Sequence, residues 1–262
     1  MVQMVAGAGT AFGSPLLESK RGSKYGYRHR MGLVPCAEFD VFHDDFHSFV
    51  VGTAITNGPA ANTPWGWQGA IIDSGSTATV YTTATNGANG VLSISDATFS
   101  EGVGIYSNKS FQLVSGKRFF LEARVYTDDV TDNEIQIGLN DQTATTNPED
   151  LWTTTAANLV TFGLLDGSAY PRMLVDKSNG GTSVQTQTVK PMVVNTWHTL
   201  AIGYDGTYVT GWIDGDLVMT WSGASTTIPT ATALGIHFGG RNGDGAGSNV
   251  ILFDYIRVVS ER

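Results

Sequence analysis

The 25-residue stretch from Trp197 to Trp221 constrains the fold of this chain more than any other part. Residues 198–204 alternate apolar with small or polar side chains, which is the period-two pattern of a half-buried strand. Asp205-Gly206 and Asp214-Gly215 then separate runs of β-prone residues. Asp-Gly predicts a type I′ hairpin turn, in which both central residues take a positive φ. The stretch therefore predicts a three-stranded antiparallel meander, around which the rest of the chain packs.

The composition agrees with an all-β fold that has many turns. The chain contains 32 glycines and only 15% charged residues. No window of a dozen residues sustains helical periodicity with good caps. A length of 262 residues is within the range of single all-β sandwiches. We predict a two-sheet antiparallel β-sandwich over residues 39–262, preceded by an extended basic N-terminal arm over residues 1–38.

The same stretch resembles a known family. W-H-x-L-x-I-x-Y-D-G, followed by I-D-G-x-x-V, is similar to the hallmark hairpins of the concanavalin A-like (laminin G-like) jelly roll. Residues 253–258 are similar to the last strand of that family, and residues 119–125 to one of its middle strands. The resemblance covers residues 39–262 and implies a jelly-roll sandwich. It leaves the function open, because this fold hosts lectins, glycosidases, adhesion modules and virion proteins.

Charge divides the chain into two parts. Residues 1–37 hold five basic residues and one acidic residue, a net charge of +4, whereas residues 38–262 hold ten basic and 23 acidic residues, a net charge of −13. The acidic body argues against nucleic-acid binding, which needs a basic face. The basic arm is suited to an acidic neighbour, including another copy of this chain.

Targeting and redox signals are few. The first 13 residues do not form a convincing signal peptide, and no run of 18 apolar residues predicts a membrane span. The lone Cys36 excludes an intramolecular disulfide framework. We therefore expect synthesis in a reducing cytoplasm and no contact with a membrane.

The arm is rich in Gly, Ala and Ser, with the run K-R-G-S-K-Y-G-Y-R-H-R in its middle. Such a composition is typical of a disordered tail. We favour the alternative that the arm lies across a partner surface, because Tyr and Arg give large contacts with few rotors to freeze. The predicted partner-binding residues are Lys20, Arg21, Lys24, Tyr25, Tyr27, Arg28 and Arg30.

The last predicted strand also suggests assembly. Residues 250–253 are apolar in succession, which predicts a strand that is buried on both faces. One face meets the core of a two-layer sandwich, and the arm, a loop or another subunit must cover the other. We take this as an indication of a homo-oligomer.

Three tryptophans are candidate glycan or subunit contacts. Trp65 and Trp67 form a W-G-W sequence, whose ring faces can stack on pyranose rings. A core or subunit contact explains the pair equally well, and we favour it. Trp152 lies in the long irregular stretch 140–158, and long loops of compact β domains often carry function.

Clusters of acidic residues suggest calcium without requiring it. Asp128, Asp129, Asp132 and Glu134 lie close together between predicted strands, and hard cations prefer several carboxylate oxygens. A solvated turn explains the cluster equally well. The run from His43 to His47 and the stretch 241–245 are explained in the same way. We predict no metal and no cofactor, with calcium as the alternative.

No catalytic motif stands out. The resemblance implies that a glycosidase of this fold would carry Glu-x-Asp-x-x-Glu on one strand, as nucleophile and acid. Glu122 stands alone in its strand, and the spacing of Asp132 and Glu134 does not match. G-x-S-x-G, H-E-x-x-H and a phosphate-binding glycine loop are also missing from the sequence. We therefore expect that the chain is not an enzyme and has no catalytic residues.

Two functions remain. The favoured one is a structural virion protein on the surface of a phage capsid, which decorates or cements coat subunits through its arm and sandwich edges. The acidic β body with a basic arm resembles capsid-decorating jelly-roll proteins, and repeated copies turn a modest contact into avidity. Its partners would be the coat protein and neighbouring copies. The alternative is a carbohydrate-binding, lectin-like module, including a phage adhesion role, with Trp65, Trp67 and Trp152 stacking on sugars.

Overall fold

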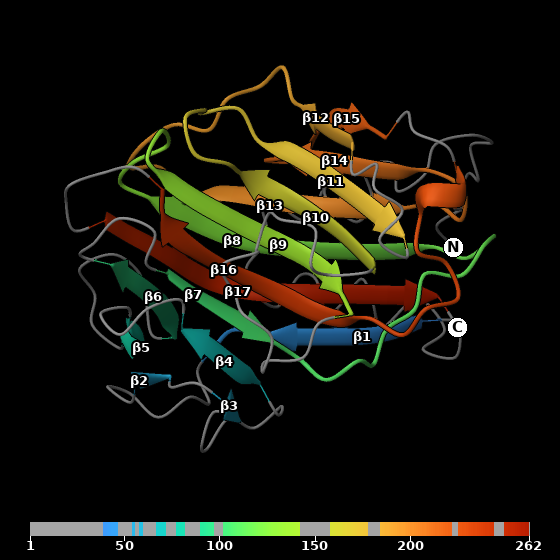
Figure 1. Cartoon of the computed structure of the whole chain (residues 1–262), viewed down its shortest axis with the longest axis horizontal. Helices are drawn as coiled ribbons and strands as arrows, with labels where there is room; N and C mark the ends of the chain where they lie inside the picture. The colour runs from blue at the N-terminus through green and yellow to red at the C-terminus, as the bar shows by residue number, and fades with distance from the viewer. Residues whose placement is uncertain are drawn as a thin grey trace, which may run out of the picture.

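The computed structural model describes residues 39–46, 54–55, 58–59, 67–71, 77–81, 90–96, 102–141, 158–177, 184–221, 225–243 and 249–261. Most of these residues lie in antiparallel strands that form two sheets packed face to face (Figure 1). The predicted two-sheet jelly-roll sandwich is thereby confirmed. The predicted arm, residues 1–38, lies outside the described residues. None of the described helices is long and apolar enough to cross a membrane.

The nine-stranded sheet has the order β15-β14-β13-β8-β17-β6-β5-β2, and β1 also pairs with β17. Its strands are β1 (Phe39–Asp44), β2 (Ala54–Ile55), β5 (Thr77–Tyr81), β6 (Val91–Asp96), β8 (Phe119–Thr127), β13 (His198–Tyr204), β14 (Val209–Ile213), β15 (Asp216–Thr220) and β17 (Asn249–Glu261).

The eight-stranded sheet has the order β12-β11-β10-β9-β16-β7-β4-β3. Its strands are β3 (Gly58–Pro59), β4 (Gln68–Ile71), β7 (Gly102–Tyr106), β9 (Asn133–Asn140), β10 (Asn158–Leu164), β11 (Arg172–Lys177), β12 (Val184–Gln187) and β16 (Gly235–Asn242). The short 3₁₀ helix η4 (Ser225–Thr227) lies between β15 and β16 in the chain.

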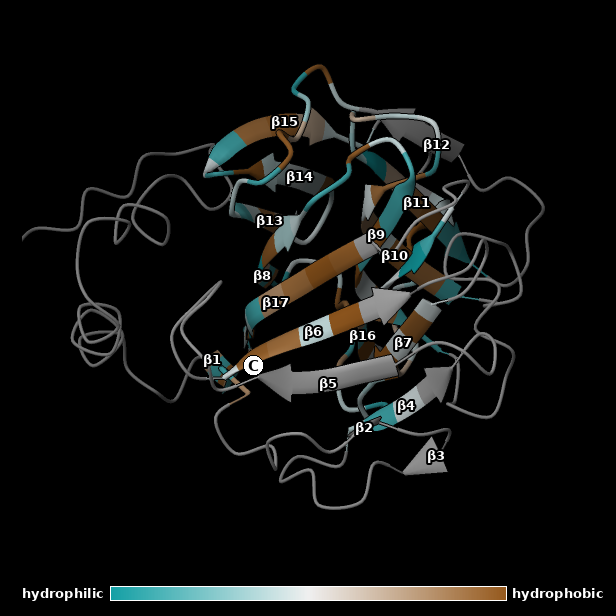
Figure 2. Cartoon of the chain, turned by 90° about the vertical axis from the view of Figure 1, so that its left-hand side faces the viewer, coloured by the Kyte–Doolittle hydropathy of each residue, from teal (hydrophilic) through white to brown (hydrophobic). Residues whose placement is uncertain are grey.

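Successive side chains of a strand point to opposite faces of its sheet. The apolar side chains on the facing sides of the two sheets form the core between them. Ile135, Ile137 and Leu139 of β9 are buried in it. Phe238 of β16 contacts the rings of Trp67 and Phe253, at centroid distances of 5.3 and 5.0 Å. Figure 2 shows the apolar stretches along β6 and β17, two strands of the nine-stranded sheet.

β17 lies in the middle of the nine-stranded sheet. It pairs with β8 along one side, and with both β6 and β1 along the other. Ile251, Leu252 and Phe253 are all buried, as predicted for a strand covered on both faces. This burial arises within one chain, so it does not require a neighbouring subunit.

The meander is confirmed as β13-β14-β15, but only one of its two turns is type I′. Asp214 and Gly215 have φ values of 54° and 80°, as a type I′ turn requires. The prediction for Asp205-Gly206 is wrong, because four residues separate β13 from β14 and only Gly206 has a positive φ, of 97°. There the Asp205 carboxylate accepts the backbone N–H groups of Thr207 and Tyr208, at 2.8 and 2.6 Å, which forms an Asx turn instead.

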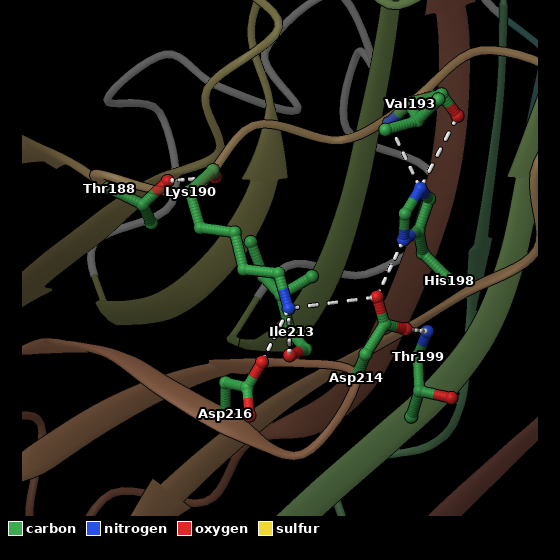
Figure 3. Close-up of polar contacts among 8 residues, drawn as sticks. All are labelled: Thr188, Lys190, Val193, His198, Thr199, Ile213, Asp214 and Asp216. Carbon is green, nitrogen blue, oxygen red and sulfur yellow. Dashed lines mark hydrogen bonds and ion pairs between the residues drawn. The ribbon is translucent and has the colours of Figure 1, made fainter.

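The type I′ turn is held in place by a histidine (Figure 3). His198 Nδ1 donates to Asp214 Oδ2 at 2.8 Å, while Asp214 Oδ1 accepts the backbone N–H of Thr199 at 2.9 Å. The backbone N–H of Val193 donates to His198 Nε2 at 2.9 Å, which places the ring proton on Nδ1. Lys190 Nζ lies 4.0 Å from Asp214 Oδ2 and 2.6 Å from Asp216 Oδ2. These contacts therefore hold the β14–β15 turn against the start of β13 and against the loop that precedes β13.

We expect Asp214→Asn to destabilise the fold by about 1 kcal/mol at pH 7, since charge-assisted hydrogen bonds to a half-exposed group are lost. Asn still tolerates the positive φ. Burial alone would raise the pKa of Asp214, but the bonds from His198 and Thr199 and the charge of Lys190 lower it overall. The carboxylate thus contributes stability above the unfolded pKa of 3.8, and this contribution is lost as the pH falls through the lower folded pKa.

Urea denaturation at pH 7 and in increasingly acid buffer measures this effect. The difference between wild type and Asp214→Asn should shrink as the pH falls below about 4. A difference that stays constant into acid would show that the carboxylate charge contributes nothing.

Candidate functional site

Polar side chains gather on the side of the eight-stranded sheet that faces away from the core. The odd-numbered residues of β9 from 135 to 139 point into the core, so the even-numbered ones point outward. The same reasoning applies to β7, β10, β11 and β16, whose apolar residues also alternate into the core. The resulting outer-face cluster consists of Tyr106, Glu134, Gln136, Asn140, Thr161, Arg172, Asp176, His237 and Arg241.

The cross-strand register arranges this face in rows. In one row, Thr161 lies opposite Gly138, which lies opposite His237, and His237 lies opposite Tyr106. Neighbouring strands are about 4.8 Å apart, so the side chains of such a row are close neighbours. The register thus brings together residues from β10, β16 and β7 that are far apart in the sequence.

The next row is almost free of side chains. Gly163, Gln136, Gly239 and Gly104 lie opposite one another in that order, and we call these four residues the glycine row. Arg172 of β11 lies opposite Gly163 at one end of it. A Cβ atom at Gly163 would collide with the carbonyl oxygen of Ile135, and one at Gly239 with that of Val103. The backbone therefore requires glycine at both positions. Gln136 is the one residue of this row that carries a side chain.

Several polar atoms of the outer-face cluster are buried without a hydrogen-bond partner within the described part of the chain. They are Gln136 Nε2 and Oε1, Asn140 Oδ1, Thr161 Oγ1, Asp176 Oδ2, and His237 Nδ1 and Nε2. Leaving such an atom unsatisfied costs about 1–3 kcal/mol, so native proteins satisfy nearly all of them. Ordered water or a ligand supplies the bonds when the protein does not. Amide, hydroxyl and imidazole groups therefore converge here with unused bonding capacity.

His237 contributes to this face as a neutral ring. It is fully buried, and burial lowers its pKa to about 3. Its ring stacks on that of Tyr106, with centroids 5.2 Å apart and planes 20° apart. At neutral pH the imidazole therefore offers one N–H donor and one nitrogen acceptor, without a charge.

Glu134 and Arg241 form an ion pair at the edge of the glycine row. Arg241 Nη2 donates to Glu134 Oε1 at 2.9 Å, and Arg241 Nε donates to Glu134 Oε2. The Glu134 side chain is 1% exposed and that of Arg241 is 23% exposed. Two parallel bonds between a guanidinium and a carboxylate use both carboxylate oxygens. The pair thus presents little net charge to anything bound beside it.

The tryptophans predicted as candidate contacts do not belong to this face. Trp67 lies in the core with 1% of its surface exposed, and its Nε1 donates to Asp44 Oδ2 at 2.8 Å. Its ring packs edge to face against the rings of Phe42 and Phe238. Trp67 is therefore a core residue, which is the interpretation favoured from the sequence. Trp65 and Trp152 lie outside the described residues. So do the arm residues Lys20, Arg21, Lys24, Tyr25, Tyr27, Arg28 and Arg30.

The acidic cluster between β8 and β9 is engaged in turn chemistry. Asp129 Oδ1 accepts the backbone N–H groups of Thr131 and Asp132 at 2.7 and 2.9 Å. Asp128 Oδ1 accepts the backbone N–H of Val250 at 2.9 Å, and Glu134 is paired with Arg241. Among the described residues, no group of three or more His, Cys, Asp or Glu side chains is arranged to hold a metal ion. Hydrogen bonds within the protein therefore account for three of the four carboxylates, those of Asp128, Asp129 and Glu134.

Sequence reasoning missed the central residues of the face, namely Gln136, Thr161 and His237. A signal was present, because N-E-I-Q-I-G-L-N and G-I-H-F-G-G-R-N alternate apolar residues with polar or glycine residues. Such alternation ordinarily indicates a strand with one face in water. The register and the burial of the polar side are what identify it as a candidate site.

Comparisons with known proteins extend the picture of the fold. No family model and no curated protein matches this chain. Solved structures do match: peanut lectin with a 9-mer peptide has a TM-score of 0.54 at 12% identity, covering 86% of this chain and 98% of that one. A structure titled for endo-acting O-glycanases that members of the human gut microbiota express to initiate mucin breakdown has a TM-score of 0.53 at 14% identity, covering 84% and 98%.

The Crh5 transglycosylase in complex with NAG matches with a TM-score of 0.52 at 18% identity, and 83% of each chain is covered. A native glycosidic hydrolase matches with a TM-score of 0.51 at 13% identity. The expectation that this chain is not an enzyme is contradicted by these comparisons, because enzymes are prominent among the structures that share its fold. The missing Glu-x-Asp-x-x-Glu motif was too narrow a criterion to exclude activity. The fold is that of the concanavalin A-like lectins and glucanases.

Proposed function

We propose that this chain is a carbohydrate-binding protein whose glycan site is the outer-face cluster around the glycine row. The observation that carries the proposal is the set of buried amide, hydroxyl and imidazole atoms without described protein partners. Sugar hydroxyls donate and accept hydrogen bonds at once, so they match such a mixed set. Hydrogen bonds shielded from bulk water are also stronger and more selective.

The comparisons support the same proposal. A lectin, an O-glycanase structure and a transglycosylase with NAG share the fold at low identity. Whether bound glycan is also cleaved or transferred is a second readout of the same experiment. The capsid-decoration hypothesis depends on residues 1–38, which lie outside the described residues, and it gains no support from these comparisons. It stays a prediction.

Gln136→Leu tests the glycan site. We expect it to weaken glycan binding at least about tenfold, because one amide that bonds the ligand on both its donor and acceptor sides is replaced by an apolar group. Stability should be unchanged or raised, since the substitution removes a buried amide without described protein partners. Gln112→Leu is the matched control, because Gln112 is exposed and lies outside the outer-face cluster.

The measurement is a glycan array with wild type, followed by calorimetric titration of each variant with the strongest hit. Release of reducing ends is followed on the same glycans. The proposal is wrong if wild type binds no glycan, or if Gln136→Leu binds as tightly as Gln112→Leu.

A further inference from the structure

The nine-stranded sheet carries apolar residues on the side that faces away from the core. The odd-numbered residues of β8 from 119 to 125 point into the core, so Phe120 points outward. Phe120 packs with Ala201 of β13 and Val259 of β17, and we call these three residues the second apolar cluster. Phe120 and Val259 lie opposite each other and are 0% and 2% exposed. Because the outer side of an antiparallel sheet ordinarily carries polar residues in water, burial here requires a cover.

The polar groups beside this cluster are also shielded from water. Glu122 of β8 lies opposite Arg257 of β17 and Ala201 of β13, in the row next to that of Phe120. Both charged side chains are buried, although Glu and Arg are among the residues that proteins bury least often. The covered area therefore includes parts of β17, β8 and β13.

Aromatic and aliphatic side chains continue the apolar surface on both sides of the cluster. Phe39 of β1 and Trp212 of β14 pack against it and are themselves only partly buried. Val41 lies opposite Val259, and Leu217 lies opposite Trp212, and both of these aliphatic side chains are exposed. Together with the second apolar cluster, these four residues form an apolar band that crosses the sheet from β1 to β15.

The chain before β1 enters the sheet beside this band. Phe39 is the first residue of β1, and its ring packs against the second apolar cluster. The segment before it, residues 31–38, reads M-G-L-V-P-C-A-E and is mainly apolar, unlike the basic run 20–30. Four strand spacings separate β1 from β14, which is about 19 Å. Eight extended residues span about 26 Å, so the segment is long enough to cross the band as far as β14.

We propose that residues 31–38 lie across the outer side of the nine-stranded sheet of their own chain, with their apolar side chains against the apolar band. The segment lies outside the described residues, so the proposal rests on the surface that receives it and on the point where it enters β1. The same chain is favoured over a second copy because a tethered segment has an effective concentration of about millimolar. This surface belongs to the other sheet from the outer-face cluster, so the proposal is independent of the glycan site.

The accessibility of Cys36 tests whether the segment is docked. Cys36 is the only cysteine of the chain and lies within residues 31–38. We expect its thiol in the full chain to react with a maleimide at least about tenfold more slowly than the same thiol in a synthetic peptide of residues 31–38, since docking limits access. Equal rates would overturn the proposal.

Photochemical crosslinking identifies the surface and the chain to which the segment is bound. A benzophenone maleimide is attached to Cys36 in an equal mixture of isotope-labelled and unlabelled protein, and crosslinked peptides are identified by mass spectrometry. We expect crosslinks to β8 and β13 that join peptides of the same isotope only. Mixed-isotope crosslinks to these strands would show that a second copy supplies the segment, and crosslinks to the eight-stranded sheet would place it elsewhere. Either result contradicts docking on the same chain's nine-stranded sheet.

Val41→Asp tests the receiving surface. Val41 is 47% exposed, so the substitution places a charge in the apolar band without opening the core. We expect it to bring the labelling rate of Cys36 close to that of the free peptide. Val114→Asp is the matched control, because Val114 is 38% exposed and lies outside the band, and it should keep the wild-type rate.

Leu33→Asp makes the same test from the segment and changes no described residue, so it decides the matter if Val41→Asp does not fold. It should also raise the labelling rate of Cys36 close to that of the free peptide, whereas Val2→Asp, far from the segment, should not. A slow rate that persists in Leu33→Asp would show that something other than the apolar band protects Cys36, and the proposal would be wrong.

Discussion

Glu122→Gln should lower the free energy of unfolding by about 3–5 kcal/mol, the usual cost of removing one partner from a buried ion pair. Glu122 lies on β8, on the side of the nine-stranded sheet that faces away from the core. Its side chain is 5% exposed, and Oε1 accepts hydrogen bonds at 2.8 Å from both Tyr255 Oη and Arg257 Nη2. Burial, followed by the charge of Glu122, raises the pKa of Tyr255, so the phenol stays protonated and remains a donor.

The loss should be large because the variant removes the negative charge that Glu122 places 2.8 Å from the buried Arg257 guanidinium. Glutamine retains the shape of the side chain, so the measurement isolates the charge. The matched control is Glu261→Gln, whose partner is Arg118. These two side chains are 29% and 49% exposed, so solvent screens the pair and the expected loss is below about 1 kcal/mol. Urea denaturation at pH 7 measures both losses, and equal values would contradict the argument from burial.

Trp67→Ala should cost about 3–5 kcal/mol, as expected for removal of a large core side chain. Its indole packs edge to face on Phe42 and Phe238, at centroid distances of 5.6 and 5.3 Å. The substitution also takes from the buried Asp44 carboxylate the N–H donor that helps to offset its desolvation. A cavity and a less satisfied buried carboxylate thus arise together.

Trp67→Phe separates these two contributions. It restores much of the ring packing but not the N–H donor, so it should cost less than Trp67→Ala and more than an exposed substitution. Tyr208→Ala serves as the exposed control, because Tyr208 is 56% exposed. Thermal and urea unfolding give the stabilities, and glycan titration is run in parallel. Normal stability with abolished glycan binding in Trp67→Ala would instead favour the sugar-stacking interpretation of this residue.

Local patterns allowed much of the fold to be predicted. The strand over residues 198–204 and the Asp214-Gly215 turn are decided by neighbouring residues, and both are present as predicted. The alternation predicted a half-buried strand, however, whereas β13 is buried along nearly its whole length. The apolar run 250–253 likewise indicated a doubly buried strand. The Asp205-Gly206 turn was mispredicted because the Asp205 side chain offers the backbone a competing set of hydrogen bonds.

The candidate site could not be predicted in the same way. Gln136 lies opposite Gly163 on one side and Gly239 on the other, and this pairing is fixed by the sheet register. In the sequence, the polar residues of β9 and β16 look like ordinary solvent-facing positions. Only the packed strands show that they are buried together. Non-local pairing therefore creates the site, whereas the local sequence merely permits it.

The central position of β17 has a consequence for the biosynthesis of this protein. The chain emerges from the ribosome from its N-terminus, so β8 and β6 are made long before the strand that joins them. Until residues 249–261 arrive, the nascent polypeptide holds two half-sheets with unpaired edges, which are prone to self-association. Such long-range closure also makes refolding slow. Maturation should accordingly be most vulnerable just before translation of this segment, when a holdase chaperone would be of greatest benefit.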